Sequence, residues 1–94
     1  MARSLSPFTR LTLLMSELKS NKIEDLRDVT KCDLAHHAAQ LQTDFEDPNQ
    51  IELAGTIGAE SDLLLSMIRA GDLAGAEEQR KTLLATCRKL KDLL

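Results

Sequence analysis

Two pairs of potential metal ligands lie four residues apart in the segment CDLAHHA. Cys32 precedes His36 by four residues, and Asp33 precedes His37 by the same interval. On an α-helix this spacing places both members of a pair on one face, where they could bind a transition metal. A structural zinc needs about four ligands, and Cys87 stands far from any other ligand. We therefore predict no metal site and no cofactor, with both histidines at the surface or partly buried.

A second group of ionisable side chains lies in the segment TDFEDPNQIE. Its acidic members are Asp44, Glu46, Asp47 and Glu52. Paired carboxylates can act as general acid and base, but carboxylates around a helix N-terminus are also favoured by the helix dipole. The second explanation is sufficient for this pattern, and the chain shows neither a glycine-rich phosphate loop nor a Ser-His-Asp set. We expect a protein that is not an enzyme and that binds no small-molecule substrate.

Composition narrows the choice of partner. The 94 residues carry a formal net charge of −3 and include two Phe, no Trp and no Tyr. A chain of this kind is poorly suited to bind phosphate backbones or to stack on bases. The run Leu13-Leu14-Met15 is much shorter than a signal-peptide core, and no stretch approaches the roughly 20 apolar residues that span a bilayer. We expect a cytoplasmic protein that binds neither nucleic acid nor membranes.

Capping signals divide the chain into helices. Polar N-cap residues, prolines of a first helical turn and a glycine suited to a helix end occur at four places: Ser6-Pro7, Thr30 with Asp33, Asp47-Pro48 and Gly71-Asp72. These signals predict helices over residues 7–20, 31–46, 48–70 and 73–94. Residues 23–29 are long enough for a short helix of their own.

Apolar residues recur every three or four positions along the predicted helices, as expected for helices that pack together. The last helix shows this most clearly, with a heptad-like seam at Leu73, Ala76, Arg80, Leu83, Cys87, Leu90 and Leu94. The sequence therefore predicts one all-α domain over residues 1–94, a compact bundle of three to four helices built from antiparallel helical hairpins. We expect Cys32 and Cys87 to be reduced, buried thiols at helical positions.

Two glycines lie near the start of the helix predicted at 48–70. Gly55 and Gly58 each cost that helix roughly 1 kcal/mol relative to alanine. A chain that keeps both is expected to use the missing side chains, which let a neighbouring helix approach closely.

Residues 8–70 place a helix bearing FTRLTLLMSELK before a longer helix, a break at DPNQ and a further apolar helix. This layout resembles the small E-type cochaperones of type III secretion needle and translocator subunits. Members of that family fold as short helical hairpins that shield an aggregation-prone secreted helix until export. The resemblance implies a chaperone whose client is one amphipathic helix.

We expect a non-catalytic protein interaction module, a small chaperone or adaptor that shields an amphipathic helix of a partner protein. The partner would lie against six aliphatic residues, namely Leu11, Leu14, Leu18, Ile57, Leu64 and Ile68. Two alternatives remain open. An inhibitor or regulator of phage or plasmid type would bind a host protein through Asp44, Glu46, Asp47 and Glu52. A structural homodimer would form through the last helix, at Arg80, Leu83, Cys87 and Leu90, with Arg80 helping to set the register.

Overall fold

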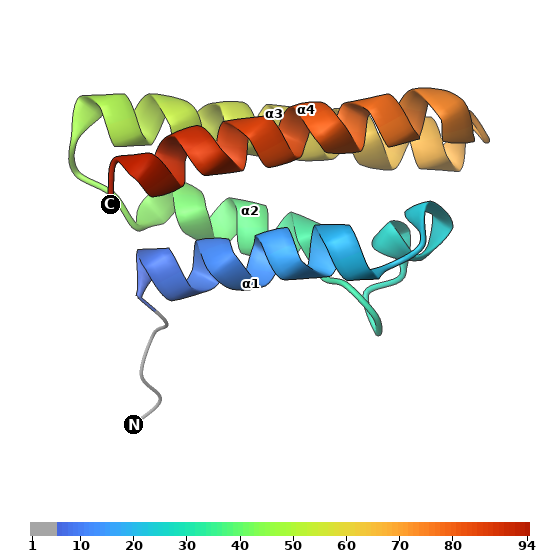
Figure 1. Cartoon of the computed structure of the whole chain (residues 1–94), viewed down its shortest axis with the longest axis horizontal. Coiled ribbons are helices and arrows are strands. Elements are labelled where there is room, and N and C mark those ends of the chain that lie inside the picture. The colour runs from blue at the N-terminus through green and yellow to red at the C-terminus, as the bar shows by residue number, and fades with distance from the viewer. Residues whose placement is uncertain (1–5) are drawn as a thin grey trace.

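Four α-helices and one short 3-10 helix make up the computed structural model, which describes residues 6–94. The elements are α1 (Pro7–Ser20), η1 (Ile23–Arg27), α2 (Leu34–Thr43), α3 (Pro48–Arg69) and α4 (Leu73–Asp92). Successive α-helices run in alternating directions, with the long α3–α4 hairpin on one side and α1 and α2 on the other (Figure 1). The described residues contain no strand. The predicted all-α bundle of antiparallel hairpins is therefore confirmed.

Three of the four α-helices start at the cap residues predicted from the sequence. The hydroxyl of Ser6 accepts from the N–H of Thr9 at 3.1 Å, and the Asp72 carboxylate accepts from the N–H of Gly75 at 2.9 Å. Asp47 caps α3 in the same way, with a proline in the first turn. Gly71 adopts a φ of +80°, the left-handed conformation that ends a helix at low cost for glycine. These predicted boundaries are confirmed.

The start of α2 differs from the prediction. The N–H and hydroxyl of Thr30 both donate to Asp28, at 3.0 and 2.7 Å, and hold the pKa of that carboxyl below its usual value. Thr30 is therefore engaged in a turn, and Asp33 caps α2 by accepting from the N–H of His36 at 3.3 Å. As a result Cys32 lies in the loop before α2. Its prediction at a helical position is wrong.

The core is aliphatic and lies between the four α-helices and η1. Its largest completely buried aliphatic side chains are Leu11, Leu14, Leu18, Leu26, Leu34, Leu41, Ile57, Leu64, Leu83 and Leu90. α3 packs against both α2 and α4, and α1 packs against α2 and α4. α2 ends at Thr43, three residues before its predicted end, and the turn that follows carries Phe45 into the core.

Of the two glycines in α3, one lies at a close helix contact. Gly58 is buried, and a Cβ atom there would collide with the side-chain amide of Gln42 on α2. Gly55 is exposed, with no atom near the position of its Cβ. The predicted close approach is confirmed at Gly58 and is wrong at Gly55, which lies about 60° around the helix axis from Gly58, on the exposed side of that contact.

Candidate functional site

The outward side of α1 carries an apolar surface that no other element of residues 6–94 covers. Phe8 is 49% exposed and Leu13 is 38% exposed, although both are large apolar side chains. A shallow depression of about 390 Å³ lies over this side of the helix. Five residues line it: Phe8, Thr9, Thr12, Leu13 and Ser16. We call these five residues the α1 face.

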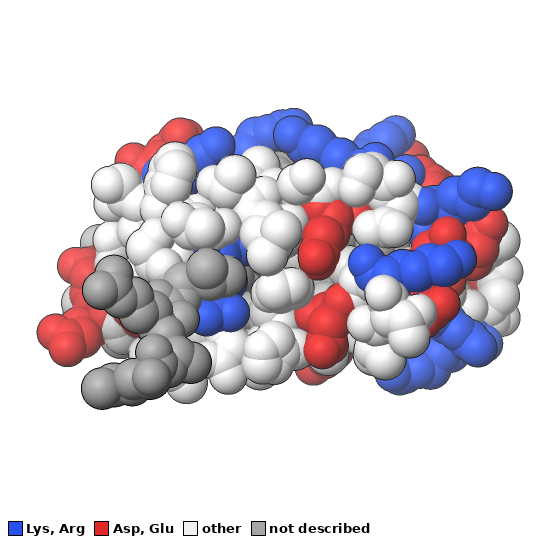
Figure 2. Space-filling model, turned by 90° about the horizontal axis from the view of Figure 1, so that it is seen from below, with Lys and Arg blue, Asp and Glu red and all other residues white. Residues whose placement is uncertain are grey.

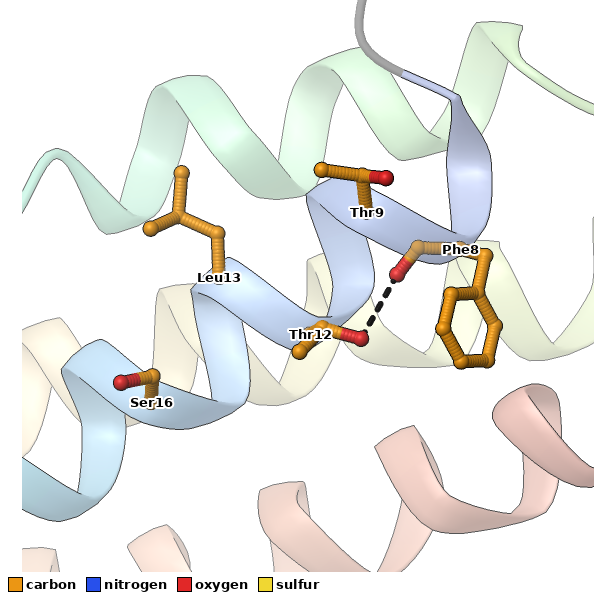
Figure 3. Close-up of a pocket in the computed structure, with 5 residues that line it drawn as sticks. All are labelled: Phe8, Thr9, Thr12, Leu13 and Ser16. Atoms are coloured by element: carbon orange, nitrogen blue, oxygen red, sulfur yellow. Dashed lines mark hydrogen bonds between the residues drawn. The ribbon is translucent and has the colours of Figure 1, made fainter.

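The two large side chains of the α1 face diverge around smaller ones. In Figure 3 the Phe8 ring leans toward α4 and the Leu13 side chain leans toward α2, with Thr12 between them. The Phe8 ring also contacts α4 through Lys91, whose Nζ lies 5.3 Å from the ring centroid. The centre of the face is therefore low and is built from hydroxyl-bearing residues, which leaves room for the ridge of another helix.

The hydroxyl groups at this centre are already hydrogen-bonded within α1. The hydroxyl of Thr12 donates to the carbonyl oxygen of Phe8 at 2.9 Å (Figure 3). The hydroxyl of Thr9 accepts from that of Ser6 at 2.8 Å. Covering either threonine would therefore not leave an unpaired hydroxyl, so its burial against an apolar partner is inexpensive.

Charge is absent from the exposed part of this helix between Ser6 and Ser16. The one charged residue in that stretch, Arg10, is buried, and its Nε lies 3.2 Å from Oδ2 of Asp44. One turn further on, Glu17 is half-buried and lies against the start of α2. Figure 2 shows an uncharged patch on this side of the bundle, bordered near the middle of the view by acidic groups and at the top and right by Lys and Arg, with a few basic atoms visible within it.

The neighbouring helix α2 extends the uncharged region. Leu34–Thr43 contains no Asp, Glu, Lys or Arg. Its exposed members include Ala35, His36 and Ala39. In a chain in which 29% of residues are charged, two adjacent helices with so little exposed charge are a local departure from the rest of the surface. Charge-poor surface with exposed aromatic and aliphatic groups is typical of protein contact sites.

The six residues predicted to bind a partner lie in the core. Leu11, Leu14, Leu18, Ile57 and Leu64 are completely buried, and Ile68 is 5% exposed. They belong to one core, because α1 and α3 both turn these stripes toward the centre of the bundle. The prediction that they line an open groove is therefore wrong for the folded chain. Helical periodicity is the same for a core stripe and an interface stripe, which is why the sequence could not separate the two.

The predicted homodimer seam of α4 is also used within the chain. Leu83, Cys87 and Leu90 are completely buried in the single bundle. Arg80 donates from Nη1 to the carbonyl oxygens of Leu18 and Asn21, at 3.3 and 3.1 Å. These residues join α4 to α3 and to the end of α1, so they are not available to a second copy. The prediction of a homodimer seam at these residues is therefore wrong for the folded chain, for the same reason as the predicted groove: the residues are buried within the bundle.

The four acidic residues do not form a shared site. Asp44 is ion-paired with Arg10, and Asp47 accepts from the backbone N–H groups of Asn49 and Gln50 at 3.1 and 3.2 Å. Glu46 and Glu52 are exposed. Two of the four carboxylates thus have structural partners, and one of them, Asp47, caps a helix N-terminus as the sequence explanation requires.

Two of the residues first considered as ligands, Cys32 and His37, meet at Glu17, where α1 contacts the start of α2. Glu17 Oε2 accepts from Cys32 Sγ at 3.5 Å and lies 3.4 Å from Nε2 of His37. Burial, reinforced by the Glu17 charge, raises the pKa of the Cys32 thiol to about 12, so this thiol is protonated at neutral pH. His36 is exposed instead. Among residues 6–94 no group of three or more His, Cys, Asp or Glu is arranged to hold a metal.

Comparisons with known proteins add no assignment. No family model matches the chain, and neither a curated protein nor a solved structure shows significant similarity to it. None of the helices in residues 6–94 has both the length and the apolar character needed to cross a bilayer. The interpretation of the site therefore rests on the surface itself.

Phe8 and the small residues of the α1 face were not among the predicted site residues. The periodicity of α1 places Phe8 on the same stripe as Leu11, three positions further on, and so predicts that it is buried. The available signal was the lack of charge. From Ser6 to Ser16 the sequence places a single charged residue, Arg10, on a helix whose two sides could not both be buried.

Proposed function

We propose that this chain is a non-catalytic protein interaction module that packs an amphipathic helix of a partner protein against the α1 face. The observation that carries the proposal is the exposure of Phe8 and Leu13 on a helix side without exposed charge. A partner helix that presents apolar residues at spacings of three and four would cover both side chains and insert between them. The chaperone form of this function follows the resemblance to the type III cochaperones.

Several properties of the α1 face support binding to an apolar helix over binding to a charged ligand. On α1 the nearest exposed cation is Lys19, beyond the end of the face, and among residues 6–94 the cation at its edge is Lys91 of α4, which lies against the Phe8 ring. Covering a Phe and a Leu that are each exposed by more than a third would contribute about 1 kcal/mol or more per side chain. The proposal places the chain in the cytoplasm, which agrees with its two free, buried thiols.

Photo-crosslinking in the native cells tests the proposal. A benzophenone amino acid replaces Leu13 in one variant and Leu63, which is 48% exposed on α3, in a matched control. We expect position 13 to form an adduct with one other protein, and the crosslinked peptide to carry apolar residues with helical spacing. The adduct is expected to persist at about 0.5 M salt, because apolar contacts are not screened. Equal labelling from position 63, or an adduct that disappears at this salt concentration, would contradict the proposal.

A further inference from the structure

The α1 face is complementary to itself, and this complementarity depends on the order of its large and small residues. Along one ridge of the helix lie Phe8, Thr12 and Ser16, spaced by four, and along the next lie Thr9 and Leu13. Each ridge therefore has one large side chain at one end and a small one at the other. An antiparallel copy of the same ridge presents the opposite order.

We propose that, in the absence of a partner helix, the α1 face binds the α1 face of a second copy of this chain, with the two helices antiparallel. A two-fold axis between the levels of Leu11 and Thr12 places Phe8 near Ser16 of the second copy, a pairing centred on Thr12, and Leu13 near Thr9 of the second copy, a pairing centred on Leu11. Both pairings occur in the same register to within one residue. Large side chains therefore meet small ones along the whole contact, as close packing of two helices requires.

The lack of exposed charge on the α1 face also favours binding to a second copy of the chain. A two-fold contact brings like residues near one another, so a face with exposed charges opposes like charges across the axis. None of the five residues of the α1 face is charged, because Arg10 is turned inward to Asp44; a charged group beside the face is Lys91 of α4, at the Phe8 ring. The uncharged surface of α2 beside it, with Ala35 and Ala39 exposed, adds no repulsion. The net charge of −3 per chain is small enough to permit association.

The α1 dimer differs from the α4 dimer considered from the sequence. It leaves every buried contact of the bundle in place, whereas an α4 dimer would have to expose Leu83, Cys87 and Leu90. The inference rests on the proposed function only in using the same face. Self-association and partner binding are then mutually exclusive, so the dimer protects the α1 face until a partner helix replaces the second copy.

Sedimentation equilibrium of the full chain, from about 5 to about 500 µM, tests the dimer. We expect a monomer–dimer equilibrium whose dissociation constant rises at least about tenfold in the Leu13→Glu variant, because this change introduces like charges into the contact. The Leu63→Glu variant changes an exposed residue of α3, outside the α1 face, and is expected to keep the wild-type dissociation constant. A wild-type chain that is monomeric at all these concentrations, or a dimer that both variants weaken equally, would overturn the inference.

A disulfide trap gives a second test that does not depend on the folding of Leu13→Glu. Helix axes 8–10 Å apart bring the two Cα atoms of a residue beside the two-fold axis to within disulfide range. Both native thiols are buried, so an introduced cysteine is the reactive one. We expect Thr12→Cys to form an interchain disulfide rapidly, and Ser66→Cys, exposed on α3, to remain largely reduced. Equal oxidation of the two variants would overturn the proposed geometry.

The two proposals fail separately. A monomeric chain whose position 13 crosslinks to another protein retains the proposed function and loses the dimer. A chain whose position 13 crosslinks only to a second copy retains the dimer and loses the partner helix.

Discussion

The guanidinium group of Arg80 on α4 donates a hydrogen bond to the carbonyl oxygen of Leu18 in the last turn of α1, with 3.3 Å between Nη1 and the oxygen. The same nitrogen donates to the carbonyl oxygen of Asn21 at 3.1 Å. The last carbonyl groups of a helix have no partner within the helix, and here a side chain from the far end of the sequence supplies one. This contact ties α1 to the α3–α4 hairpin and so holds the α1 face in position.

Arg80→Met is expected to lower the free energy of unfolding by about 1–3 kcal/mol, because two partly buried carbonyl groups lose a charged donor. Urea denaturation measures the change. Lys81→Met is the matched control, since Lys81 is exposed and pairs only with exposed Glu78. We expect the control to change stability by less than about 0.5 kcal/mol. Equal losses in the two variants would show that Arg80 does not act through α1.

Leu64 and Leu63 are adjacent but lie in opposite environments, since Leu64 is completely buried and Leu63 is 48% exposed. Leu64→Ala is expected to cost about 2–5 kcal/mol, because the deletion leaves a cavity in the core. Leu63→Ala is expected to cost less than about 0.5 kcal/mol. Thermal unfolding followed by circular dichroism separates the two. If both variants melt together, the described orientation of α3 is incorrect.

Gly55 and Gly58 are expected to respond differently to alanine. Gly55→Ala should stabilise the chain by up to about 1 kcal/mol, because the position is open and alanine favours the helix. Gly58→Ala should gain less, because its Cβ displaces the side chain of Gln42. A double-mutant cycle with Gln42→Ala measures this coupling by urea denaturation. Additive effects at Gly58 and Gln42 would contradict the contact.

Cys32 and Cys87 are expected to make stability fall at alkaline pH. Burial raises the pKa of both thiols to about 12, from an ordinary value near 9. Between about pH 9 and pH 12 the unfolded chain loses protons that the folded chain retains, so unfolding becomes easier as pH rises. Below about pH 9 both states keep the protons and the thiols have no effect on this pH dependence.

Urea midpoints at pH 7.5 and at pH 10.5 measure this effect, and lysine titration is cancelled by comparison with the Cys32→Ala, Cys87→Ala double variant. We expect the double variant to show the shallower decline over this interval. Equal slopes would mean that the thiols do not carry the pH dependence.

Helix boundaries were the most predictable feature of this chain. Ser6, Asp47 and Asp72 each bond to a backbone N–H within three residues, so their roles are visible in a short window of sequence. The start of α2 was less predictable because Thr30 and Asp33 compete as caps. The competition is decided by Asp28, which engages Thr30 in a turn.

The candidate site was not predictable in the same way. Phe8 and Leu11 both fit the periodic stripe of α1, yet Leu11 is completely buried and Phe8 is half exposed. The rotation of the helix about its axis settles this, and that rotation follows from how α1 packs against both α2 and α4. The sequence shows Arg10 as the single charged residue between Ser6 and Ser16, but only the structure shows that Arg10 points inward and leaves the exposed side uncharged.

The sequence by itself determined the all-α class, the positions of most helix ends and the aliphatic composition of the core, because capping and periodicity act between residues a few positions apart. Only the tertiary structure decided which stripes are buried, that Arg80 reaches the end of α1, and that Glu17, Cys32 and His37 meet. These contacts join residues distant in the chain, and their partners are chosen by the packing of whole helices.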